Sequence, residues 1–454
     1  MGFRQAACKI DVVIVGGGIC GLACAFALGR SGHRVRVLER SDGQQHGAGI
    51  RMPPNLTKLL AEWGLEEELK KCWSCRKSTF MSLESDPETI GILEWQEDVL
   101  EEAGGQFLLT GYDEFYQILH GLALSVGAEV IFNSAVTGVE TTPRPLVRVA
   151  GGTTYSADLI IGADGDQSMV REVVTEKEDQ GTNSGHTCYT VFIPVDQLRD
   201  PDLAYWATVP QWPIGVGDNR AAFGFFTGKK MQFSLYWPDV DAPSASEAPE
   251  GWDVLFTTKT LDLASYDNRI QRLFNSVPTA QRRKYVCRER VEDWVDHTGR
   301  ILLVGEAAHP SIPHNTHATS MAIEDAEALG VLMSHLGSME QIPQLTAGFQ
   351  ELRKKRCDFI HDSERSNVLF LMLPAGEMRD RRDASLRESL VRGMDSWNDE
   401  MLRKQWENVE AGFAYHVREA AEDWWRTWGS LANNVAKKRS AELEIPIQIE
   451  SECQ

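Results

Sequence analysis

The chain has 454 residues, a formal net charge of −20 and a pI of about 5.1, a balance that argues against a nucleic-acid or anionic-membrane partner. Its length predicts two or three structural units, and 42% hydrophobic with 25% charged residues is typical of a globular protein. Nine scattered cysteines favour reduced thiols and a cytoplasmic location, and we find no apolar run long enough to span a membrane.

The first informative stretch, residues 10–40, predicts a strand, a glycine turn, a helix and a second strand. Val12–Val15 is an apolar, β-branched run, and glycines in GxGxxG spacing follow it: Gly16, Gly18 and Gly21. They permit a tight turn, close approach of the backbone to a pyrophosphate, and close packing of helix on strand. Glu39 ends the second strand, near the spacing expected of a ribose-binding carboxylate. The stretch predicts a dinucleotide-binding βαβ unit.

The next segments are a loop, a turn and a helix. Residues 47–55 contain two glycines and two prolines around Arg51, which predicts a shaped loop. The acidic segment 97–105 is interpreted as a solvated turn. A helix is expected from about Asp113 to Val126, with Asp113 as its N-cap.

The second informative stretch, residues 157–171, is a buried strand that runs into Asp164 and Gly165, with Arg171 shortly after. Residues 187–288 then carry strand patterns and many aromatic side chains, Tyr236 among them. Such a sheet is usually a core face. Inserted between halves of a nucleotide-binding domain, it is also expected to wall an apolar ligand pocket.

The third stretch begins with a buried strand that ends at Gly305 and Glu306, where ligands of α/β sheets bind. An irregular loop follows, and then a helix over 320–336. Glu324 and Asp325 in this helix are expected to support the loop. His309 and His317 with Glu306 could suggest a metal site, but the strand–loop–helix context explains them better, and we predict no metal. The remainder, to about residue 438, is helical and amphipathic.

Together the three stretches resemble the group A flavoprotein monooxygenases, the single-component aromatic hydroxylases of the para-hydroxybenzoate and salicylate hydroxylase type. The resemblance covers roughly residues 8–370 and is closest to fungal members that act in specialised metabolism. It implies an α/β fold: a Rossmann-like FAD-binding domain, an inserted antiparallel substrate domain and C-terminal helices. The expected boundaries are 8–185 and 291–370 for the FAD-binding parts, 186–290 for the substrate domain, and 371–440 for the helical region.

The resemblance also implies site residues. Those expected to bind FAD are Gly16, Gly18, Gly21, Glu39, Arg40, Arg51, Tyr112, Asp164, Gly305, Glu306, Ala318 and Thr319. Tyr236 and His314 are the candidate catalytic residues, because they correspond to positions that face flavin or substrate in relatives. Thr190 stands where some relatives have an arginine anchor, which favours a neutral substrate. The expected activity is hydroxylation or epoxidation of an aromatic small molecule with NAD(P)H and O2, by a monomer or homodimer.

Three positions depart from the family pattern. Glu306 replaces an aspartate, Tyr112 stands where an arginine is usual, and both glycines of the flavin loop are missing at Thr316 and Ala318. Because positive φ would strain Thr316, we expect the loop to take another path. The missing glycines also keep open a flavin-binding protein without oxygenase activity, a scaffold or non-redox cyclase. An NAD-dependent dehydrogenase is disfavoured, since the motifs at 164–165 and 305–306 have no place in it, and a flavin-dependent halogenase is less favoured still.

Overall fold

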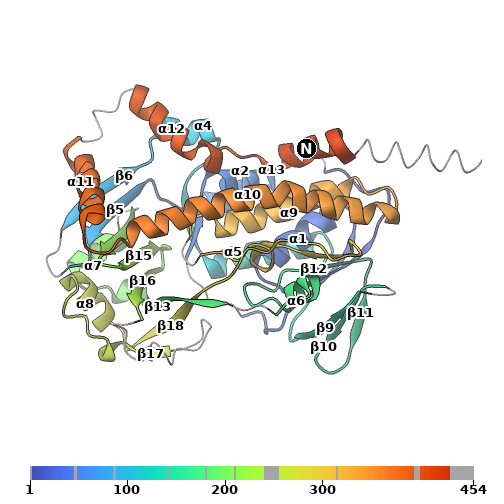
Figure 1. Ribbon diagram of the computed structural model, residues 1–454, viewed down its shortest axis with the longest axis horizontal. Helices are drawn as coiled ribbons and strands as arrows, with labels where there is room; N and C mark the ends of the chain where they lie inside the picture. The colour runs from blue at the N-terminus through green and yellow to red at the C-terminus, as the bar shows by residue number, and fades with distance from the viewer. Residues whose placement is uncertain are drawn as a thin grey trace, which may run out of the picture.

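A computed structural model describes residues 3–44, 49–84, 88–141, 144–178, 181–208, 211–239, 255–312, 315–392 and 399–429. Figure 1 shows an elongated molecule with a parallel sheet and its helices toward one end and a larger mixed sheet toward the other. The candidate His314 lies outside the described residues. In the described part of the chain, no helix is both long and apolar enough to cross a membrane.

The parallel sheet brings the three sequence motifs to one edge. Its strands, in spatial order, are β19 (Ile301–Leu303), β12 (Leu159–Gly162), β1 (Asp11–Val15), β2 (Arg34–Leu38) and β8 (Glu129–Ile131). Val15 is in register with Gly162, and Gly162 with Leu303, so β1, β12 and β19 end side by side. The residues that follow these ends are therefore neighbours, although they are up to about 290 positions apart in sequence.

Two helices of the parallel-sheet region pack against each other closely enough to need a small residue. They are α1 (Ile19–Arg30) and α9 (Ala318–Ser334). A Cβ at Gly330 would lie 2.8 Å from the Ala27 Cβ, which explains the glycine in α9. The partner helix is buried along most of its length and is rich in Ala and Leu, as a helix inside a core must be.

An eight-stranded mixed sheet carries most of the aromatic residues. Its strands, in order, are β17 (Leu255–Thr257), β18 (Thr279–Cys287), β13 (Thr182–Pro194), β16 (Lys230–Pro238), β15 (Arg220–Phe226), β14 (Gln211–Gly217), β5 (Lys77–Ser82) and β6 (Thr89–Glu94). The last two come from before residue 186, so the sheet draws on more of the chain than the predicted 186–290. The domain boundaries themselves stay a prediction.

The long helix α10 (Ile342–Leu371) connects the two regions. Figure 1 shows it running beside α9 toward the mixed sheet, and it contacts both α9 and β14. Beyond it, α11 (Glu377–Arg392) packs on β6, α12 (Asp399–Phe413) on α4, and α13 (Val417–Trp424) on α9.

The remaining elements complete the two ends. The helices are α2 (Pro54–Glu62), α3 (Glu66–Leu69), α4 (Glu97–Ala103), α5 (Tyr112–Ser125), α6 (Met169–Thr175), α7 (Pro201–Thr208) and α8 (Asn268–Asn275). Two small sheets contain β3 (Gly49–Met52), β7 (Leu108–Gly111) and β4 (Trp73–Ser74), and β11 (Thr154–Ser156), β10 (Leu146–Val149) and β9 (Val136–Glu140).

Two local predictions were wrong. The acidic segment expected to be a turn forms α4, because Val99, Leu100 and Ala103 give it a buried face. Glu97 and Asp98 stand in its first turn, where they complement the helix dipole. The N-cap of α5 is Gly111, and Asp113 lies in the first turn, where a carboxylate still complements the helix dipole.

Candidate active site

The strand ends of the parallel sheet open into a cleft of about 570 Å³. Nine of the predicted cofactor-binding residues line it: Gly16, Gly18, Glu39, Arg40, Tyr112, Asp164, Glu306, Ala318 and Thr319. Gly21 and Gly305 do not line it but pack against residues that do, Gly16 and Cys20. The structure thus brings these nine residues from six separate segments of the chain to one cavity.

The glycine turn is shaped as its spacing predicted. Gly16 has a φ of +101°, and a Cβ there would lie 2.4 Å from the Ala163 carbonyl oxygen. At Gly21 a Cβ would lie 2.0 Å from the carbonyl oxygen of Gly16, so helix and turn leave no room for a side chain. Gly18, by contrast, has nothing within 4 Å of such a Cβ and faces open space at the start of α1. The turn has the geometry expected of a pyrophosphate cradle beside a helix N-terminus.

Glu39 has a structural contact as well as its place on the cleft wall. Its carboxylate is 8% exposed and accepts hydrogen bonds from the Gly17 N–H at 2.7 Å and the Ser41 N–H at 2.8 Å. These bonds hold the glycine turn against the end of β2. The ribose contact expected of Glu39 stays a prediction.

The Asp164 turn is fastened to the end of β19 by Arg171. This buried guanidinium donates to the carbonyl oxygens of Ala307 at 2.8 Å and Glu306 at 2.7 Å, and to that of Asp166 at 2.9 Å. Asp164 accepts from the Ser168 hydroxyl and the Val170 N–H, and burial raises the pKa of its carboxyl. Arg171 therefore joins two of the three motifs through backbone groups.

Gly305 needs to be glycine for both conformation and space. Its φ is +59°, and a Cβ would lie 2.8 Å from the Cys20 sulfur. The next residue, Glu306, is exposed and accepts a hydrogen bond from the Ser311 hydroxyl. Glu306 lines the cofactor cleft and also the cavity beside it, so its carboxylate stands where the two meet.

The loop that lacks the family glycines is held by side chains. The Thr316 N–H donates to the Glu364 carboxylate at 3.0 Å, and the Ala318 N–H donates to Asn315 Oδ1 at 2.5 Å. Arg51 donates to the Asn315 carbonyl at 2.9 Å. Thr316 does not adopt the positive φ that would strain it, and the alternative path expected of the loop stays a prediction. Sequence reasoning missed Glu364, which is 48 residues away in a helix that shows only a charged pattern.

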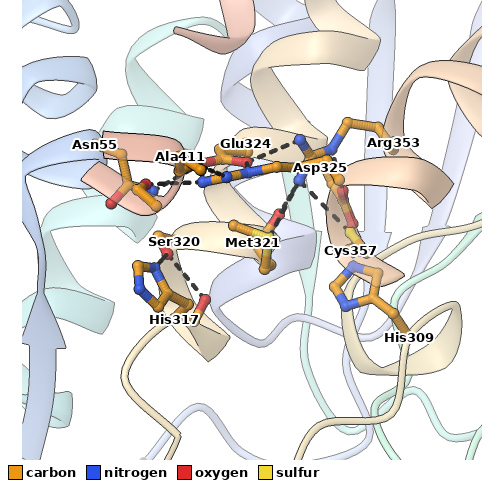
Figure 2. Close-up of polar contacts among 12 residues, drawn as sticks. Asn55, His309, His317, Ser320, Met321, Glu324, Asp325, Arg353, Cys357 and Ala411 are labelled. Carbon is orange, nitrogen blue, oxygen red and sulfur yellow. Dashed lines mark hydrogen bonds and ion pairs between the residues drawn. The ribbon is translucent and has the colours of Figure 1, made fainter. Parts of the chain in front are cut away.

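A buried ionic network lies behind the cleft (Figure 2). Arg353 donates to Asp325 Oδ1 and to Glu324 Oε2, both at 2.8 Å, and all three side chains are 0–1% exposed. Asp325 Oδ2 also accepts from the Gly305 N–H at 2.8 Å and pairs with His309 at 2.7 Å. Asp325 holds the Gly305 turn directly, and the support of the following loop expected of Glu324 and Asp325 stays a prediction.

Within the described residues, His309, Asp325 and Cys357 form a group whose ligand atoms lie within 4.8 Å of one another. Arg353 Nη2, however, lies 3.7 Å from the Cys357 sulfur, and both Asp325 oxygens already accept hydrogen bonds. A fixed guanidinium at this place repels a cation, which favours an ionic network over a metal site.

The second cavity, of about 370 Å³, adjoins the first through shared wall residues: Glu306, Ala318 and Thr319. Phe225, Tyr285 and Ile312 give it an apolar surface, as the aromatic sheet predicted. Arg51 also lines it, with its guanidinium 4.4 Å from the Trp212 ring centroid. Burial lowers the pKa of Arg51 to about 10, so it remains a cation at neutral pH.

Tyr236 lies behind this cavity. Its side chain is 3% exposed, with ring centroids 5.8 Å from Phe223 and 6.1 Å from Tyr285. Tyr285 lines the cavity and Tyr236 does not. Burial raises the pKa of the Tyr236 hydroxyl well above its usual range, which keeps the phenol protonated. Its catalytic role, like that of His314, stays a prediction.

Tyr112 stands on the cleft wall where relatives have an arginine. It begins α5 and stacks on Tyr116 with ring centroids 6.4 Å apart. Burial, followed by the charge of Glu306, raises the pKa of its hydroxyl. The wall here is therefore a neutral aromatic surface.

The glycine cradle, Glu39 and the Glu306 end of β19 fit an extended dinucleotide cofactor, and comparison with known proteins identifies it. A family profile described as FAD binding domain matches residues 9–356. The FAD-dependent monooxygenase OpS4 of Beauveria bassiana is 23% identical over 396 residues, 83% of this chain and 89% of that protein. Hispidin-3-hydroxylase of Neonothopanus nambi is 28% identical over 402 residues, 82% and 93% of the two chains.

Among solved structures, CtdE in complex with FAD and substrate shares the fold, with a TM-score of 0.74 at 20% identity over 93% of this chain and 100% of that one. The profile covers well over half of the chain and includes all three motifs. The protein therefore belongs to the FAD-binding family of the group A flavin monooxygenases.

Proposed function

We propose that this monooxygenase uses NAD(P)H and O2 to hydroxylate, or epoxidise, an aromatic small molecule, in specialised metabolism of the fungal type. The observation that carries the proposal is the junction of the two cavities. The cofactor cleft opens, past Glu306 and the start of α9, into a space walled by Phe225, Tyr285 and Ile312. Such a space suits a flat apolar ring.

FAD, when bound, accepts a hydride from the nicotinamide nucleotide and activates O2, and the protein supplies binding, orientation and a dry site. Gly16, Gly18 and Glu39 would hold the ADP half, and Glu306 the middle of the cofactor. The N-terminus of α9 carries about half a positive charge, which would stabilise a negative charge on the reduced ring. Tyr285 would give the substrate an aromatic wall. Tyr236, which packs behind Tyr285, is proposed to polarise the substrate.

Fungal relatives support the metabolic setting. OpS4 and hispidin-3-hydroxylase come from fungi, and the name of the second states a hydroxylation. This supports a substrate with an electron-rich ring, as in phenols, because oxygen transfer of this type attacks electron-rich carbon.

The test is substrate-stimulated NAD(P)H oxidation by the FAD-loaded protein. Phenols and aromatic acids are screened, and the product is identified by its added oxygen mass with ¹⁸O2. A gain of one ¹⁸O atom at a ratio near one product per NAD(P)H supports the proposal. The alternative is the flavin-binding scaffold or non-redox cyclase. It is supported if NAD(P)H fails to reduce the bound FAD both with and without aromatic compounds.

A further inference from the structure

The substrate cavity has a strongly cationic side. Among the described residues that line it, four are arginines and two are carboxylates: Arg51, Arg283, Arg288 and Arg365, against Asp166 and Glu306. Arg51 is turned toward the Asn315 carbonyl and the Trp212 ring. The other three line the cavity from β18, from the segment just after it, and from α10.

Two of these arginines share one carboxylate oxygen. Asp166 Oδ2 accepts from Arg283 Nη2 at 2.9 Å and from Arg288 Nη1 at 3.3 Å. The Arg288 side chain is 7% exposed and that of Arg283 is 18% exposed, so both guanidiniums are largely removed from water. In this setting an electrostatic contact is worth more than at an open surface.

Arg365 is the most available of the group. It is exposed, lines the cavity, and forms no ion pair within the described part of the chain. His361, one helical turn earlier on α10, lines the same wall. The lining of the same cavity also includes the apolar side chains of Phe225 and Ile312. The shape therefore combines a surface for a ring with cationic donors at its edge.

We propose that Arg365 and Arg283, flanked by Arg288 and His361, bind an oxyanion at the edge of this cavity. The source is the carboxylate of an aromatic substrate or a phosphate of the nicotinamide nucleotide, which share the chemistry of planar or tetrahedral oxygen acceptors for guanidinium. The inference rests on the proposed function, which takes this cavity to be the substrate site. It replaces the expectation of a neutral substrate drawn from Thr190, whose hydroxyl bonds to Ser234 inside the sheet, away from the cavity wall.

The first test is binding to the FAD-loaded protein, read from the flavin absorption spectrum. Benzoate and its neutral counterpart benzamide are titrated separately, and so are NADP⁺ and NAD⁺. The parent should bind benzoate about ten- to hundredfold more tightly than benzamide, or NADP⁺ better than NAD⁺ by a similar factor, as expected for one or two charge-assisted hydrogen bonds. Arg365→Gln should abolish that preference. Because this readout needs no turnover, it is separate from the success of the proposed hydroxylation.

The matched control is Arg290→Gln. Arg290 is two residues beyond Arg288, pairs with Asp358 and Asp362 on the outside of α10, and does not line the cavity. It removes the same charge from the same region and should leave both preferences intact. Arg283→Gln is the second variant, and melting curves confirm that it folds after losing its Asp166 contact.

The pattern of loss identifies the source. A loss confined to benzoate assigns the site to a substrate carboxylate, and a loss confined to the 2′-phosphate preference of NADP⁺ assigns it to the nucleotide. A parent that binds benzoate no better than benzamide and NADP⁺ no better than NAD⁺ would overturn the proposal. So would a preference that survives Arg365→Gln and Arg283→Gln.

Discussion

Removal of Arg353 should destabilise the protein severely. Arg353 is 0% exposed and is held between two carboxylates that are themselves buried, those of Glu324 and Asp325. Arg353→Met keeps much of the side-chain volume but leaves both carboxylates with less compensation. Breaking a buried ion pair from one side costs about 3–5 kcal/mol, so we expect a loss in that range.

The measurement is urea unfolding of the apoprotein at neutral pH, compared with Lys354→Met as the control. Lys354 is the next residue, and its partner Glu292 is 78% exposed, so that pair should contribute no more than about 1 kcal/mol. Equal losses for the two variants would refute the reasoning. So would a loss below about 1 kcal/mol for Arg353→Met.

The pH dependence of the same variant gives the sign of the effect. Burial opposes ionisation of Asp325, but His309 and Arg353 hold its pKa below the usual value, and Arg356 and Arg353 do the same for Glu324. The parent therefore has this stabilisation above the unfolded carboxyl pKa of about 4 and loses it as the pH falls through the folded values. Without Arg353, burial favours the protonated form of both carboxyls over the ionised form. The difference in unfolding free energy between parent and Arg353→Met should therefore become smaller as the pH falls.

Three further predictions concern the cofactor and substrate. Glu39→Ala should weaken FAD binding about ten- to hundredfold in a fluorescence-quenching titration, because a charge-assisted ribose contact and the hydrogen bond from the Gly17 N–H are lost together. An unchanged FAD affinity would show that Glu39 only shapes the turn. Glu306→Asp should retain substantial NAD(P)H oxidation while Glu306→Ala loses FAD affinity, and the assignment of Glu306 fails if the alanine variant binds FAD as the parent does. Tyr236→Phe should slow hydroxylation by about 10²–10⁴ and divert NAD(P)H to hydrogen peroxide if its hydroxyl polarises the substrate. Tyr285→Phe, on the cavity wall, is the comparison, and an unchanged product ratio in Tyr236→Phe would return that residue to core packing.

The sequence could predict those parts of the site that a short local pattern of residues specifies. Gly16, Asp164 and Gly305 each follow a short apolar strand, and the general rule for parallel sheets places such strand ends together. The register of β1, β12 and β19 confirms that placement. Arg283, Arg365 and Glu364 lie in segments whose patterns report only a strand or a charged helix. Arg365 reaches the cavity, and Glu364 reaches the loop before α9, through the course of α10. Arg283 reaches the cavity through the place of β18 in the mixed sheet, and no local spacing encodes either arrangement.

The course of α10 also explains how the chain manages without the family glycines. One face of this helix presents Arg353, Cys357, His361 and Arg365 at four-residue intervals, with Glu364 beside the last. Over a rise of roughly 18 Å, this face passes from the buried network that fixes Gly305 to the cavity wall. Glu364 accepts the Thr316 N–H on the way. The loop therefore obtains from a distant helix the position that glycine conformations would otherwise supply. The strand end at Gly305 and the loop before α9 are therefore both tied to α10, the first through Asp325 and Arg353 and the second through Glu364.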